Sequence, residues 1–170
     1  MRLPAAIATV LVAVWLEVGL LAPLRPFGVV PNLVLVVILL LAIRLPASNA
    51  VALAVTSGLF LDLFSGSDFG LRTAFYVLLV LVVNLLSRQG TDFNNVSVVA
   101  GVVVAGTVVL NAAVVTDLAL GGASLRLDYI VGQIGVELIC NLGLLVIIRT
   151  LFGSLGRPSA EAVAVGHGRG

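Results

Sequence analysis

Residues 58–71, GLFLDLFSGSDFGL, place an acid and a turn between two apolar runs, and this stretch decides how the chain is organised. Asp62 is set among leucine and phenylalanine, and a carboxylate at the centre of a bilayer costs about 2.5 kcal/mol or more. Asp62 must therefore lie near an interface or be paired. Residues 65–68, SGSD, are turn formers that satisfy freed backbone groups. The stretch predicts a helix end, a tight turn and a helix start.

The predicted turn would bring Asp62 and Arg72 to the same side of a membrane. One interpretation is an ion pair in which each side chain neutralises the other. The alternative is a feature that binds a partner or a ligand. The sequence leaves both open.

The composition predicts an integral membrane protein. The 170 residues are 61% hydrophobic and 10% charged, so the chain cannot cover itself with polar surface in water. The net charge of +1 and the lack of a polybasic patch argue against nucleic acid as a partner. Cys140 lies in an apolar run and His167 in a Gly-rich tail, so we expect neither a metal site nor a cofactor.

Six apolar stretches are about long enough to cross a bilayer as helices, which predicts an all-α membrane protein with a bundle of six transmembrane helices. The expected spans are residues 4–22, 27–44 or 31–44, 47–64, 71–87, 96–118 and 129–152. A cleaved signal peptide is the alternative for the first span, but Trp15 and Glu17 interrupt its apolar core. Residues 1–152 would form one transmembrane domain, and residues 153–170 a disordered cytoplasmic tail.

The arginines predict the orientation. With the amino terminus inside the cell, six arginines fall inside and three outside. Cytoplasmic loops of membrane proteins carry the excess of positive charge. We therefore expect both termini in the cytoplasm and residues 65–70 outside.

Polar groups of the spans collect in the outer half of the predicted bundle. Gln133, Glu137 and Asn141 recur every four residues and so share a helix face, which is not expected to look at lipid. The cluster would be either a partner-binding surface or ligand pocket, or a set of interface residues that pair with one another. Its candidate members are Glu17, Asp62, Ser65, Gly66, Ser67, Arg72, Asp117 and Glu137.

The sequence lacks most of the residue patterns that enzymes acting inside membranes use for catalysis. No histidine within a span accompanies a serine, as acyl transfer would need. Spacing alone leaves an intramembrane aspartyl pair of Asp62 and Asp117 open, but neither residue has the companion motif of such a protease. We expect a protein without catalytic residues.

Several motifs resemble the rod shape-determining protein MreD family. That family opens its second span with proline and Asn or Asp, matched here by Pro31-Asn32. It continues with Gly-x-x-x-Asp-Leu-x-Ser-Gly-Ser, matched by residues 58–67, and then with Gly-Leu or Gly-Val and a polar or basic residue, matched by residues 70–72. The resemblance covers residues 31–84, about a third of the chain. Length and six-span layout agree as well.

The resemblance implies a non-enzymatic subunit of the bacterial elongation (rod) complex, in the cytoplasmic (inner) membrane, which supports cell shape and peptidoglycan synthesis. The implied partner is MreC, and through it MreB, the glycosyltransferase RodA and a class B penicillin-binding protein.

The MreD fold is also similar to the substrate-binding subunits of energy-coupling factor transporters, which supplies the alternative: a membrane subunit that binds a vitamin. Such a subunit is expected to present an Ala-x-x-x-Ala face to its partner. Ala50 and Ala54 have that spacing.

Overall fold

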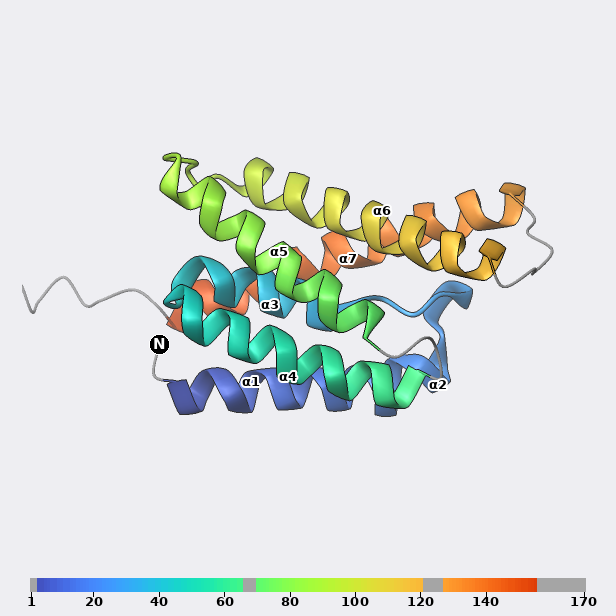
Figure 1. Ribbon diagram of the computed structural model, residues 1–170, viewed down its shortest axis with the longest axis horizontal. Coiled ribbons are helices and arrows are strands. Elements are labelled where there is room, and N and C mark those ends of the chain that lie inside the picture. The colour runs from blue at the N-terminus through green and yellow to red at the C-terminus, as the bar shows by residue number, and fades with distance from the viewer. Residues whose placement is uncertain (1–2, 66–69, 121–126, 156–170) are drawn as a thin grey trace, which may run out of the picture.

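The computed structural model describes residues 3–65, 70–120 and 127–155, and the regular structure in these ranges is entirely helical. The first helix joins α1 (Leu3–Leu16), a π-helical turn (Glu17–Leu21) and α2 (Ala22–Leu24). After a 3₁₀ turn (Pro26–Gly28) come α3 (Leu33–Arg44), α4 (Ala47–Ser65), α5 (Leu71–Arg88), α6 (Val96–Leu120) and α7 (Leu127–Leu155) (Figure 1).

Five helices are long and apolar enough to cross a membrane: the first helix, α4, α5, α6 and α7. Large apolar side chains on their outer faces are exposed, among them Trp15, Leu63 and Ile139. A surface of this kind is stable in hydrocarbon and not in water. The predicted all-helical, multi-pass membrane architecture is confirmed at this level.

Helix α3 differs from the full span that the sequence predicts. It has 12 residues, a length of about 18 Å, against the roughly 30 Å of a hydrocarbon core. Of the two expected starts, the one near Phe27 is wrong because Val29 is extended; the helix begins at Leu33, two residues after Pro31, with Asn32 as its N-cap. Proline removes a backbone donor and disfavours helix in the residue before it, so Pro31 delays the start of the helix.

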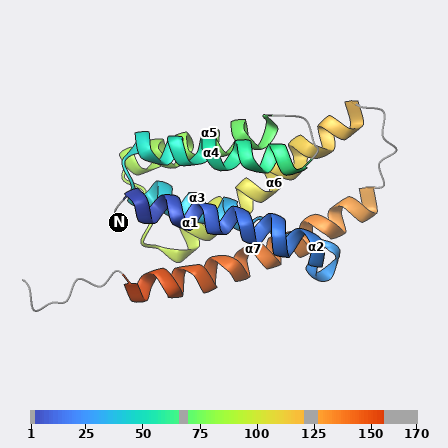
Figure 2. The same ribbon diagram turned by 90° about the horizontal axis from the view of Figure 1, so that it is seen from below.

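The short helix is the centre of the bundle. Its residues from Leu33 to Ala42 are all buried, and it contacts α1, α4, α5, α6 and α7. Figure 2 shows α4 and α5 on one side of α3 and α7 on the other. Helix α3 is apolar all round because it is enclosed by protein on every side.

The last helix covers the sixth expected span. Helix α7 runs from Leu127 to Leu155, around the expected residues 129–152. The rest of the predicted tail, residues 156–170, lies outside the described residues. The start of α1 and the end of α7 lie at the same end of the bundle (Figures 1 and 2).

Candidate functional site

Asp62 caps the amino terminus of α5. Its carboxylate accepts hydrogen bonds from the backbone N–H groups of Gly70 (3.0 Å), Arg72 (3.1 Å) and Thr73 (3.1 Å), and from the Thr73 hydroxyl (2.7 Å). The first N–H groups of a helix have no partner within the helix, and a carboxylate placed there also meets the positive end of the helix dipole. Asp62 is 3% exposed, so these bonds stabilise both the acid and the start of α5.

Two glycines make this arrangement possible. Gly70, the N-cap of α5, has φ of 103°. Residues other than glycine rarely adopt this backbone conformation. At Gly58 a Cβ atom would lie 2.4 Å from the Cα atom of Thr73. Helices α4 and α5 therefore approach to a distance that only glycine allows, and this approach brings Thr73 to Asp62.

The ion pair between Asp62 and Arg72, one of the two interpretations of the sequence, is wrong because Arg72 pairs with a different acid. The Arg72 guanidinium lies 3.7 Å from the carboxylate of Glu17, whereas Asp62 binds the backbone N–H of Arg72. The physical reason is that a short turn presents Asp62 with the free backbone donors of α5. The side chain of Arg72 then extends toward the first helix.

Glu17 also caps a helix, the central α3. Its Oε2 atom accepts a hydrogen bond of 2.8 Å from the backbone N–H of Val34. Glu17 opens the π-helical turn of the first helix and is 3% exposed. A helix that begins inside a membrane protein presents the positive end of its dipole there. The carboxylate of Glu17 lies at this end of α3.

Asn32 connects α3 to three other helices. Its Oδ1 atom accepts from the backbone N–H of Leu35 (2.8 Å) and from the hydroxyl of Tyr76 (2.9 Å). Its own N–H donates to Oδ1 of Asn141 (2.8 Å). The Nδ2 atom of Asn141 donates in turn to the hydroxyl of Thr107 (2.9 Å). This chain of bonds links α5, α3, α7 and α6 in the buried core.

Glu137 is bound one turn before Asn141 on α7. Its Oε2 atom accepts a hydrogen bond of 3.0 Å from Nδ2 of Asn111. Glu137 and Asn141 therefore face other helices, as their spacing predicted. We call this set of bonded residues the polar network: Glu17, Asn32, Asp62, Arg72, Tyr76, Thr107, Asn111, Glu137 and Asn141.

The remaining candidates are placed only in part. Ser65 ends α4 and Asp117 lies in α6, and for both the description covers the backbone alone. Gly66 and Ser67 lie outside the described residues. The Asp62 carboxylate, one member of the possible aspartyl pair with Asp117, accepts four hydrogen bonds at the start of α5.

The polar network contains residues that sequence reasoning missed. Tyr76 and Thr107 carry single hydroxyls in apolar runs, and such residues are common in membrane helices. Asn111 is a single amide in the apolar run of residues 96–118. The regular spacing of Gln133, Glu137 and Asn141 was the one signal that pointed to a shared internal face.

Two neighbouring hollows adjoin the polar network. The larger, about 290 Å³, is lined by Glu17, Val18, Ala22, Arg25, Val30, Leu61, Phe64 and Arg72. The smaller, about 160 Å³, is lined by Glu17, Val30, Asn32, Arg72, Leu110, Asn111, Val114 and Glu137. Because both include Glu17, Val30 and Arg72, they meet at the pair of Glu17 and Arg72.

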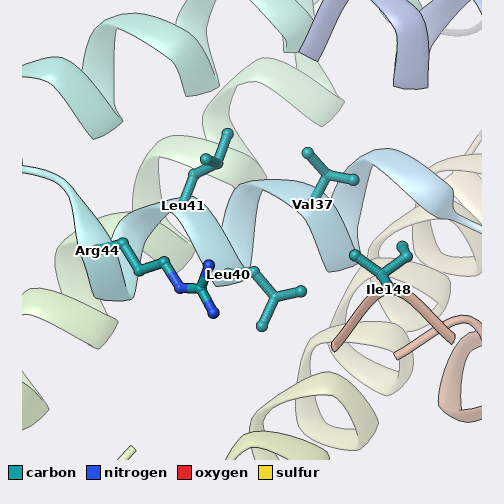
Figure 3. A pocket seen from close by; sticks show the side chains of 5 residues that line it. All are labelled: Val37, Leu40, Leu41, Arg44 and Ile148. Atoms are coloured by element: carbon teal, nitrogen blue, oxygen red, sulfur yellow. The ribbon is translucent and has the colours of Figure 1, made fainter. Parts of the chain in front are cut away.

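A third hollow of about 340 Å³ is a groove between α5 and α6. It is wholly apolar, and Gly101 and Ala105 of α6 are exposed in it. A fourth, beside Arg44 and Ile148 at the far end of α3 (Figure 3), holds about 10 Å³. That volume is close to the minimum for one water molecule, so the fourth hollow has no room for a ligand.

The described residues hold no group of three or more His, Cys, Asp or Glu side chains placed to bind a metal ion. Comparisons with protein-family models, with curated proteins and with solved structures find no match to the chain.

Proposed function

We propose that this protein is a membrane subunit of the bacterial elongation complex, of the MreD type. It would work by binding MreC, and through it MreB, RodA and a class B penicillin-binding protein, without turnover of its own. In this proposal α3 and the extended residues before it complete a sixth crossing of the cytoplasmic membrane.

The residues that carry the resemblance support the proposal because they act together in the fold. Asn32 caps α3 and binds Tyr76, Gly58 allows the close approach of α4 and α5, and Asp62 caps α5. A family signature that specifies one bundle geometry would contain residues of this kind. Their carboxylates and amides hold helix ends rather than a reacting group.

The observation that carries the proposal is the groove between α5 and α6. No charged or polar side chain lines it. A Cβ atom added at Gly101 would have no neighbour within 4 Å. Small residues four apart, such as Gly101 and Ala105, let the backbone of a second helix approach closely in lipid. The groove has the character of a helix-binding surface in lipid, and we assign it to a transmembrane helix of the partner MreC.

Substitution of Gly101 by leucine tests this surface. The side chain would fill the groove without disturbing the fold, and we expect co-expressed MreC to co-purify roughly tenfold less, as overpacking of an interface commonly costs about 1–3 kcal/mol. Gly143→Leu is the matched control, since Gly143 is an exposed glycine of α7 that also has open space around it. Equal MreC recovery with both variants would place the contact elsewhere.

The proposed orientation has both termini in the cytoplasm. Alkaline phosphatase, which is active only outside the cytoplasm, should be inactive when fused after Arg169. It should be active when fused after Gly122, between α6 and α7. Activity of the Arg169 fusion would contradict the orientation.

The transporter alternative receives less support from the structure. Ala50 and Ala54 are 1% and 0% exposed, so this pair packs inside the bundle and is not presented to a partner. The chain would need another face to meet an energy-coupling module.

A further inference from the structure

The larger hollow at the polar network has the composition of an anion site. Arg25 and Arg72 line it from two different parts of the chain, and Glu17 is its one acid. The hollow thus holds one more positive than negative charge. Its volume of about 290 Å³ is near the lower limit of small-molecule sites, roughly 300 Å³.

The two arginines retain donors that the fold does not use. Within the described part of the chain, the Arg72 guanidinium forms one ion pair, with Glu17, and its distance of 3.7 Å is longer than a hydrogen bond. The guanidinium of Arg25 has no hydrogen bond or ion pair among the described residues. Each guanidinium carries five N–H donors in a planar arrangement that matches phosphate.

Glu17 cannot serve as the counter-ion of both arginines. One of its oxygens accepts from the backbone of Val34, and the other faces Arg72. It is also buried, whereas Arg25 is exposed. Glu17 therefore leaves the guanidinium of Arg25 available to an anion that enters the hollow.

The other walls of the hollow indicate what carries this charge. They are apolar, from Val18, Ala22, Val30, Leu61 and Phe64. Phe64 and Leu24, the residue before Arg25, are each about two-thirds exposed on the outer surface. A ligand that enters from this side must combine a negative group with apolar chains.

Arg25 is held in place by an unusual backbone. Its φ of 39° is the only positive φ among the described residues other than glycine. Its N–H donates to the carbonyl of Leu21, and its carbonyl accepts from the N–H of Gly28. Glycine would adopt this conformation at less cost, and strained residues of this kind gather at functional sites.

We propose that this hollow binds the phosphate group of an anionic membrane lipid. Arg25 and Arg72 donate to the phosphate oxygens, and the apolar walls receive the start of the acyl chains. The inference does not depend on the proposed partner, because lipid binding is measured with the purified chain alone.

Native mass spectrometry of the purified protein in detergent tests the site with two lipids. We expect phosphatidylglycerol to bind with a defined stoichiometry and phosphatidylcholine, which has no net charge, to bind more weakly. Each arginine near an anionic headgroup is worth about a fivefold change in affinity. Inorganic phosphate is the third probe. Competition by millimolar phosphate would show a site for the free anion and overturn the assignment to a lipid.

Variants of Arg25 and of Glu17 are expected to change lipid binding in opposite directions. Arg25→Gln and Arg25→Gly should each weaken phosphatidylglycerol binding about fivefold, and glycine suits the backbone of that position. Glu17→Gln keeps an acceptor for Val34 and should strengthen binding by a similar factor. Arg88→Gln, an exposed arginine in the last turn of α5, is the control and should have no effect. Equal losses for Arg25→Gln and Arg88→Gln would reduce the effect to general surface charge and overturn the proposal.

Discussion

Replacement of Asp62 by alanine is expected to lower the free energy of unfolding by about 3 kcal/mol or more. Loss of an N-cap side chain costs about 1–2 kcal/mol, and each buried donor left without a partner adds roughly 1–3 kcal/mol. Asp62 receives three backbone N–H groups and one hydroxyl at a site that is 3% exposed. Unfolding in mixed micelles, followed by circular dichroism, measures the change.

Asp62→Asn and Asp92→Ala complete this experiment. Asparagine keeps one acceptor oxygen and should lie between wild type and alanine. Asp92 is an exposed aspartate that accepts one backbone bond, from Asn94, so its removal should change stability by about 0.5 kcal/mol or less. Equal stability of Asp62→Ala and wild type would show that Asp62 does not hold the start of α5.

Substitution of Gly58 by alanine is expected to destabilise the bundle by about 3 kcal/mol, at the upper end of overpacking effects. The new Cβ atom would lie 2.4 Å from Cα and 2.9 Å from Oγ1 of Thr73. Because these are mostly backbone contacts, α4 and α5 have to separate. The separation would also draw Thr73 away from Asp62, so the effects of Gly58→Ala and Asp62→Ala should not add.

Gly143→Ala is the matched control, and its expected change in the free energy of unfolding has the opposite sign. Gly143 lies in α7, and a Cβ atom there would have no neighbour within 4 Å. Alanine is favoured over glycine in a helix by about 0.5–1 kcal/mol, so this variant should be slightly more stable than wild type. Stabilisation by Gly58→Ala of the same size would contradict the close packing of α4 and α5.

The long helices could be predicted from the sequence because length and apolar composition decide them. The end of α4 and the start of α5 could be predicted from Asp62 and the small residues that follow it. The position of α3 at the centre of the bundle could not be predicted from length and composition. An apolar run of this kind fits both a lipid-facing span and a buried central helix, and only the surrounding helices decide between them.

The partners within the polar network were less predictable still. Asp62 and Arg72 are near in sequence and opposite in charge, so an ion pair was the simplest interpretation. The structure gives Asp62 the backbone of α5 and gives Arg72 the acid Glu17, which is 55 residues away in the chain. Sequence shows which residues are polar inside the bundle, whereas helix packing decides which of them meet.

Purification of the protein from its native bacterial membranes in mild detergent, with mass spectrometric identification of every co-purified chain and small molecule, tests the proposed function most directly. We predict that MreC is recovered in stoichiometric amount, with RodA and a class B penicillin-binding protein in smaller amounts. Recovery of an ATPase module and a vitamin-sized ligand in place of MreC would contradict the proposal and establish the transporter alternative.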